Sequence, residues 1–95
     1  MEATVTEAVV DNPGRHRFEL PDQGLITFAD YRVDRDRVVI LHVETPPQLR
    51  GQGSAGRLMT GALQMIRSRG QKVVPVCPYA VAFIQRHPEY QDLVA

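Results

Sequence analysis

Residues 44–58 read E-T-P-P-Q-L-R-G-Q-G-S-A-G-R-L, and this stretch decides the fold. A strand is predicted to end at its first residue, because neither Pro46 nor Pro47 can donate a hydrogen bond to a sheet. A helix is predicted to begin in its second half. The turn between them is rich in glycine and small residues and has an arginine on either side. This order predicts a turn whose backbone N–H groups converge at the start of the helix, where a phosphate-bearing ligand can bind.

The segment after this turn predicts a helix followed by a strand. The helix is expected to span about 16 residues, from Ser54, which can cap it, to Gly70, a common stop signal. Its apolar side chains recur every three or four residues, as one buried face requires: Leu58, Met59, Ala62, Leu63 and Ile66. Residues 72–76 are almost continuously apolar, which is typical of a buried parallel strand. Strand, helix and strand together predict one right-handed crossover.

The sequence on either side of the crossover completes the expected fold. Strands are expected at residues 5–10, 15–20, 25–33 and 38–44. Turns are expected between them at residues 11–14, 21–24 and 34–37. A short helix at 79–86 and a last turn at 89–94 follow. The order ββββ-α-β-α predicts an α+β fold with a mainly antiparallel sheet and one parallel crossover.

The last of these four strands carries an acid in an apolar pattern. Regular alternation places Val39, Leu41 and Val43 on one face, and Val38, Ile40, His42 and Glu44 on the other. His42 and Glu44 are therefore expected ~6.6 Å apart on one face.

The composition limits the classes of function. The chain has 95 residues, of which 43% are hydrophobic and 23% charged, and its net charge is zero. We therefore expect a single domain over residues 1–95 and no affinity for nucleic acid or an anionic membrane. A single cysteine excludes a disulfide framework and a cysteine-based zinc site, and no metal is expected. No signal peptide or membrane-spanning run is visible, so we expect a cytoplasmic protein.

Two common nucleotide motifs fit the glycine-rich turn poorly. Gly51, Gly53 and Gly56 match G-x-G-x-x-G, but the acid expected about 20 residues further on in a dinucleotide site is absent from residues 72–77. The pattern G-x-x-x-x-G-K-[ST] of triphosphate-binding loops is also absent. A dinucleotide or a triphosphate is therefore disfavoured as the ligand.

A third motif fits better. Residues 48–53, Q-L-R-G-Q-G, match Q-x-x-G-x-G after a strand that ends in an acid. This resembles the acetyl-CoA pyrophosphate loop of the GNAT superfamily of N-acetyltransferases. The segments H-V-E at 42–44, V-V-P-V-C-P-Y at 73–79 and R-H-P-E-Y-Q-D-L at 86–93 are similar to small, single-domain YjdJ-type acetyltransferases. The resemblance covers about residues 24 to 94.

The resemblance implies a GNAT-like fold and an acetyl-CoA site. Its pyrophosphate would be held by the backbone N–H groups of residues 50–55, namely Arg50, Gly51, Gln52, Gly53, Ser54 and Ala55. The backbone of Val43 and Thr45 would pair with the pantetheine arm like an added strand. The thioester would then lie beside Glu44, His42 and Cys77.

The resemblance also implies catalytic roles, each with a structural alternative. Glu44 is the expected base that takes a proton from the attacking amine; alternatively it is a strand-end carboxylate paired with an arginine. His42 shares that role or orients a water; alternatively it is a hydrogen-bonded histidine on the sheet face. Cys77 carries the acyl group or protonates the leaving thiolate; alternatively it is a small buried hydrophobe.

Two departures from larger relatives shape the expected function. Ile84 stands where many of them have a tyrosine acid, and Tyr79 is near but shifted. The short turn at 34–37 and the short C-terminal end imply an open acceptor groove, suited to a protein, a peptide or a small amine. The expected function is acetyl-CoA-dependent transfer to an amine that the sequence does not identify. The alternatives are a non-catalytic acyl-CoA-binding module and an anion-binding structural domain; the oligomeric state stays open.

Overall fold

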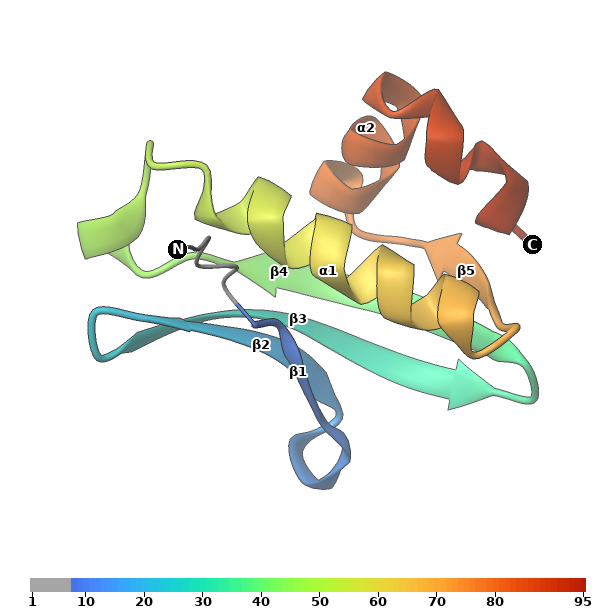
Figure 1. The fold of residues 1–95 in the computed structure, drawn as a ribbon, viewed down its shortest axis with the longest axis horizontal. Helices are drawn as coiled ribbons and strands as arrows, with labels where there is room; N and C mark the ends of the chain where they lie inside the picture. Colours follow the sequence, from blue (N-terminus) through green and yellow to red (C-terminus); the bar gives the residue numbers. More distant parts are fainter. Residues whose placement is uncertain (1–7) are drawn as a thin grey trace, which may run out of the picture.

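The computed structural model describes residues 8–95, and over that range it forms one five-stranded sheet in the order β1-β2-β3-β4-β5 (Figure 1). The antiparallel strands are β1 (Val10–Asn12), β2 (Arg17–Asp22), β3 (Leu25–Asp34) and β4 (Arg37–Glu44). The last strand, β5 (Lys72–Pro75), pairs with β4 in parallel. The predicted α+β fold, mainly antiparallel with one parallel crossover, is confirmed.

Two helices and three 3-10 turns complete the described chain. Helix α1 (Ser54–Ser68) connects β4 to β5, and α2 (Pro78–Arg86) follows β5. The 3-10 turns are η1 (Pro13–Arg15), η2 (Pro47–Leu49) and η3 (Pro88–Leu93). Helix α1 lies along one face of the sheet, with α2 and η3 beside it (Figure 1). The predicted order ββββ-α-β-α is therefore also confirmed.

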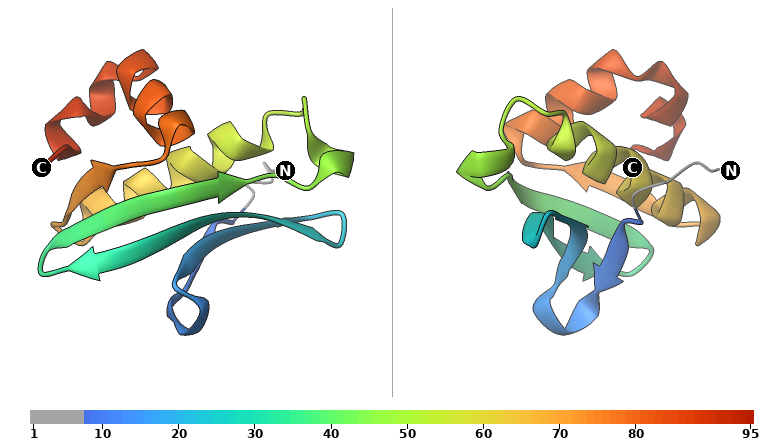
Figure 2. Two further views of the ribbon diagram at one scale, coloured as in Figure 1. Left: turned by 180° about the vertical axis from the view of Figure 1, so that it is seen from behind. Right: turned by 60° about the vertical axis from the view of Figure 1, so that its left-hand side comes forward.

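One core fills the space between the sheet, α1 and α2. The expected face of α1 is fully buried, with Leu58, Met59, Ala62, Leu63 and Ile66 at 0% exposure. The strands contribute Phe18, Leu20, Ala29, Tyr31, Val38, Ile40 and Val73. Seen from behind, the strands of the sheet lie in front of α1, and no described helix covers their outer face (Figure 2).

The N-terminal turns differ from the sequence expectation. Residues 5–7 of the first expected strand lie outside the described residues. Strand β1 continues through Asp11 and Asn12, so the turn expected at 11–14 begins later, as η1. Pro21 and Asp22 belong to β2, where they face Ile26 and Leu25. The turn itself is only Gln23-Gly24, with φ of 55° and 77°, as a tight two-residue hairpin turn requires.

The start of α1 also differs. The residue that caps the helix is Gly53, with φ of 81°, and Ser54 is the first helical residue. The Ser54 side chain is 2% exposed and makes no capping bond. Its hydroxyl instead accepts a hydrogen bond from Nη2 of Arg57 at 3.3 Å. A glycine can hold the left-handed conformation needed here, so the predicted Ser54 cap is wrong.

A β-bulge at Leu41 reverses the alternation of β4. Asp30 faces His42, whereas the next residue of β3 faces Ile40, so Leu41 is the extra residue. As a result Val43 joins Ile40 on the core side, and His42 and Glu44 face the uncovered side of the sheet. The expectation that His42 and Glu44 share a face is confirmed. The expectation that they share it with Ile40 is wrong, because sequence alternation cannot show a bulge.

Candidate functional site

The turn before α1 presents a row of unused backbone donors. Within residues 8–95, no acceptor is bonded to the N–H groups of Gly51, Gly53, Ser54, Ala55 and Gly56. The Arg50 N–H donates to Pro47 O at 3.3 Å, and the Gln52 N–H donates to Leu49 O at 3.3 Å. The positive end of the α1 dipole adds to the field of these groups. The turn therefore fits an anion. Its unbonded donors lie at residues 51 and 53–56, so they end one residue further into the helix than the predicted range of 50–55.

Glycine is required by the shape of this turn. Gly51 and Gly53 have φ of 82° and 81°, which side-chain-bearing residues rarely adopt. A Cβ at Gly51 would meet no atom within 4 Å, so the space in front of it is open. The turn, Thr45 and Tyr79 line a cavity of about 140 Å³. We call this cavity the phosphate cradle.

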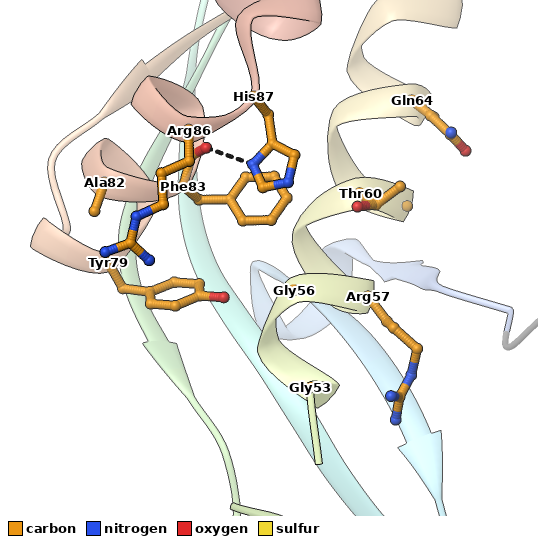
Figure 3. A pocket seen from close by; sticks show the side chains of 11 residues that line it. Gly53, Gly56, Arg57, Thr60, Gln64, Tyr79, Ala82, Phe83, Arg86 and His87 are labelled. Carbon is orange, nitrogen blue, oxygen red and sulfur yellow. Dashed lines mark hydrogen bonds between the residues drawn. The ribbon is translucent and has the colours of Figure 1, made fainter. Parts of the chain in front are cut away.

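Arg57, which no sequence motif singled out, stands beside the cradle. Its Nη1 donates to the Gln52 carbonyl at 2.8 Å, and its Nη2 lies 3.6 Å from Oδ2 of Asp22 in β2. Figure 3 shows its side chain next to Gly53 and Gly56. Arg57 follows Gly53 by four residues, which places it one helical turn from the cradle. This spacing is the feature of the sequence that indicates its position.

The edge of β4 is open next to the cradle. The pairing of β4 with β5 ends at Ile40 and Pro75. The N–H groups of Val76 and Cys77 both donate to Ile40 O, at 3.0 and 3.2 Å, and the chain then turns away into α2. Beyond Ile40, β4 pairs only with β3 among the described strands. The backbone of Val43 therefore lies on a strand edge that an extended ligand can reach.

His42 and Glu44 form a hydrogen-bonded pair on the uncovered face of the sheet. Nε2 of His42 lies 2.8 Å from Oε1 of Glu44. Because an ionised carboxylate only accepts hydrogen bonds, Nε2 carries the proton, and Nδ1 of the neutral ring is left as an acceptor. Their side chains are 55% and 42% exposed, so both remain accessible. Nη2 of Arg50 lies 3.9 Å from Oε2 of Glu44, which makes a weak ion pair. This is the pairing with an arginine that was expected if Glu44 is only a strand-end carboxylate.

Cys77 is not brought together with this pair. It is 7% exposed and belongs to the core at the start of α2. No hydrogen bond joins its thiol to His42 or Glu44. Of the three predicted catalytic residues, the structure therefore joins two.

The tyrosine acid of larger relatives has no counterpart in α2. Ile84, at the corresponding place, is 4% exposed in the core. Tyr79 points toward α1 (Figure 3), and a Cβ at Gly56 would lie 3.8 Å from its hydroxyl oxygen. Burial raises the pKa of the Tyr79 phenol, and the positive charge of Arg86 partly opposes this. Tyr79 therefore lies over the first turn of α1, within the cradle.

A larger groove continues from the cradle between α1 and α2. It has a volume of about 730 Å³, within the usual range for small-molecule sites, and shares Gly53, Gly56 and Tyr79 with the cradle. Tyr79 and Phe83 of α2 and His87, which directly follows this helix, line the groove at four-residue intervals (Figure 3). Neither Phe83 nor His87 was predicted to belong to a site, although their four-residue spacing is visible in the sequence.

Comparisons with known proteins agree with this fold. Residues 17–93 match the family model described as GCN5-related N-acetyl-transferase. The fold is similar to the solution structure of a GCN5-like protein from Staphylococcus aureus, with a TM-score of 0.72 and 21% sequence identity over 97% of this chain and 91% of that one. No described helix is long and apolar enough to cross a membrane. Among residues 8–95, no group of three or more His, Cys, Asp or Glu side chains is placed to hold a metal.

Proposed function

This chain belongs to the family of GCN5-related N-acetyltransferases, and from that premise we propose that it transfers an acetyl group from acetyl-CoA to an amine. The observation that carries the proposal is the row of five unbonded N–H groups at the start of α1, next to the open edge of β4. Such a row suits the diphosphate of coenzyme A. The open edge offers the backbone of Val43 and Thr45 to its amide-bearing arm, in the manner of an added strand.

The residues of β4 supply the proton chemistry. In the reaction, the amine nitrogen bonds to the acetyl carbon, the carbon–sulfur bond breaks, and one proton passes from the nitrogen to a base. The Glu44 carboxylate is the base, acting directly or through water; alternatively, Nδ1 of His42 accepts the proton while Glu44 orients the ring through Nε2. Solvent supplies the proton of the leaving thiolate, because the aliphatic Ile84 has no proton to donate and the Cys77 thiol is buried.

An acetyl-transfer assay tests this function. Thioester consumption is measured with acetyl-CoA and a panel of small amines and peptides, and binding of CoA is measured separately by calorimetry. We expect saturable CoA binding, and turnover that Glu44→Gln lowers without weakening that binding. An absence of CoA binding would contradict the proposal.

A second candidate function is a non-catalytic acyl-CoA-binding module. The isoleucine at position 84, which cannot donate a proton, and the burial of the Cys77 thiol favour it. CoA binding without turnover on any amine, unchanged by Glu44→Gln, would support the module over the enzyme.

The route of transfer has its own test. Attack by Cys77 would form a thioester on its sulfur, with CoA as the leaving thiol. Mass spectrometry after exposure to acetyl-CoA would then show an acetyl adduct that Cys77→Ala abolishes. Because the thiol is 7% exposed in the core, we propose direct attack by the amine and expect no adduct.

We also propose a cytoplasmic location, where a lone thiol stays reduced.

A further inference from the structure

Two residues of β3 lie beside the pair of His42 and Glu44 on the uncovered face of the sheet. Asp30 lies directly opposite His42, and Phe28 lies directly opposite Glu44. Because residues in opposite positions on paired strands share a face, both side chains belong to the face that no described helix covers (Figure 2). An amine bound at the catalytic pair therefore has the Asp30 carboxylate close by.

The Asp30 carboxylate has no partner of its own. Within the described chain its side chain makes no hydrogen bond and no ion pair, although it is partly buried. Arg17 lies directly opposite it on β2. However, Nε of Arg17 lies 2.6 Å from Oε2 of Glu19, and its Cζ lies over the Phe28 ring, 4.4 Å from the ring centroid. Arg32, two residues along the same face, is exposed and also makes no described ion pair with Asp30.

The engagement of Arg17 explains why Asp30 stays unpaired. The Glu19 carboxylate is 8% exposed and accepts a second hydrogen bond, from Nδ2 of Asn12 at 3.2 Å. These contacts hold the guanidinium over Phe28 and neutralise its charge there. The negative charge of Asp30 therefore remains available to a ligand that carries a positive charge.

The spacing between Asp30 and the catalytic pair suits two nitrogens on one short chain. On paired strands, Cβ atoms of opposite residues are about 5 Å apart, and those of diagonal residues such as Asp30 and Glu44 are about 7 Å apart. The hydrogen bond of 2.8 Å joins the Glu44 carboxylate to His42, the residue opposite Asp30. In an extended four-carbon diamine the nitrogens lie about 6 Å apart, given bonds of about 1.5 Å. One nitrogen can therefore reach the base while the other contacts Asp30.

Resting on the proposed function, we propose that Asp30 binds a second ammonium group of the acceptor, and that the preferred acceptor is a short linear diamine. One nitrogen gives its proton to the base, bonds to the acetyl carbon and displaces the thiolate of CoA. The other keeps its proton and its charge, and donates a charged hydrogen bond to the Asp30 carboxylate. Asp30 is therefore a specificity-determining residue that takes no part in the proton transfer.

Steady-state kinetics with two amines of equal length tests this inference. Butane-1,4-diamine carries the second nitrogen, and pentan-1-amine has a methyl group in its place. The ratio kcat/KM is measured for both amines with the unaltered protein, Asp30→Asn and Asp34→Asn. Asp34 is the matched control, because it is an exposed acid without a described ion pair on the same strand and face, about 13 Å further on. Calorimetry measures the binding of CoA to each protein.

We expect kcat/KM for the diamine, corrected for its two equivalent nitrogens, to exceed that for pentan-1-amine about tenfold, as one charged hydrogen bond predicts. Asp30→Asn should lose that tenfold on the diamine alone, and Asp34→Asn should keep it. CoA binding should be the same in all three proteins.

Equal values for the two amines in the unaltered protein, or an unchanged ratio in Asp30→Asn, would overturn the inference. An equal loss on both amines in Asp30→Asn would also overturn it, because Asp30 would then act through His42 and not on the acceptor. So would intact CoA binding with turnover of neither amine. The proposed function is decided separately, by CoA binding and by the wider panel of amines and peptides.

Discussion

Val9 lies directly against Gly61: a Cβ added at Gly61 would come within 2.3 Å of Cγ2 of Val9. The missing side chain lets the residue just before β1 pack against the middle of α1. Gly61→Ala should therefore displace Val9. The lost packing, about 1–3 kcal/mol, outweighs the gain in helix propensity of about 1 kcal/mol, so the free energy of unfolding should fall. Urea unfolding and the methyl NMR signals of Val9 measure this.

Gly56→Ala is the matched control in the same helix. A Cβ there would have its nearest neighbours at 3.8 Å, an ordinary contact distance. This variant should be stabilised by up to about 1 kcal/mol. Equal unfolding free energies for Gly56→Ala and Gly61→Ala would contradict the contact between Val9 and Gly61.

The glycines of the cradle should affect both stability and binding. Gly51, Gly53 and the hairpin residue Gly24 have φ of 82°, 81° and 77°. Alanine at any of the three should cost about 1–2 kcal/mol, because its Cβ crowds the backbone in this conformation. Only Gly51→Ala and Gly53→Ala should also weaken CoA binding in calorimetry. Weakened binding in Gly24→Ala would show that strain alone, and not the shape of the cradle, explains the effect.

The pair of His42 and Glu44 should behave as one unit. Glu44→Gln and His42→Gln should each lower kcat by about 100-fold, as expected for the loss of a positioned base. The double variant should be no worse than the more damaging single variant, because each substitution already removes the function of the pair. Steady-state kinetics on the four proteins gives the comparison. Fully multiplicative losses would mean that the two residues act separately.

Asp22 should oppose the binding of an anion in the cradle. Its carboxylate lies 3.6 Å from Nη2 of Arg57, so it competes for the guanidinium and adds negative charge beside the site. Asp22→Asn should strengthen CoA binding by a few-fold at low salt, and less at high salt because ions screen the charge. Asp34→Asn removes an acid from the far end of β3 and should change nothing.

Tyr31 should make stability fall at alkaline pH. Burial, together with a hydrogen bond to the Asp11 carboxylate, raises the pKa of Tyr31 from 10.0 to about 12. The folded state thus favours the neutral phenol, so its contribution is complete below pH 10 and is lost as the pH rises toward 12. In Tyr31→Phe that part of the loss should be absent. The difference in urea midpoint between the two proteins, measured from pH 9 to 12, should shrink with rising pH.

The sequence predicted the order of elements because each has a local cause. The apolar stripe of α1, the prolines after Glu44 and the continuous apolar run of β5 need no long-range information. The bulge at Leu41 escaped prediction because it depends on how β3 pairs with β4. The Ser54 cap was wrong because the glycine before it sets the geometry of the turn.

In the candidate site, too, most features with a local cause were predicted and those that depend on long-range packing were not. The glycine turn and the pair of His42 and Glu44 follow from local spacing and were predicted. The aromatic face of α2 was not predicted, because its role depends on two helices that meet only in the folded chain. Arg57 was not predicted although its spacing from Gly53 is local. Whether Cys77 takes part could not be predicted either, since its burial is set by the packing around it.

The bulge in β4 gives this strand one spare residue. If position 41 were deleted, Ile40 and His42 would become neighbours, and the pairing with Tyr31 and Asp30 would be continuous. His42 and Glu44 would still point outward, and Val43 would still point into the core. Evolution can therefore lengthen or shorten the strand by one residue at this position without turning its acid–base pair inward.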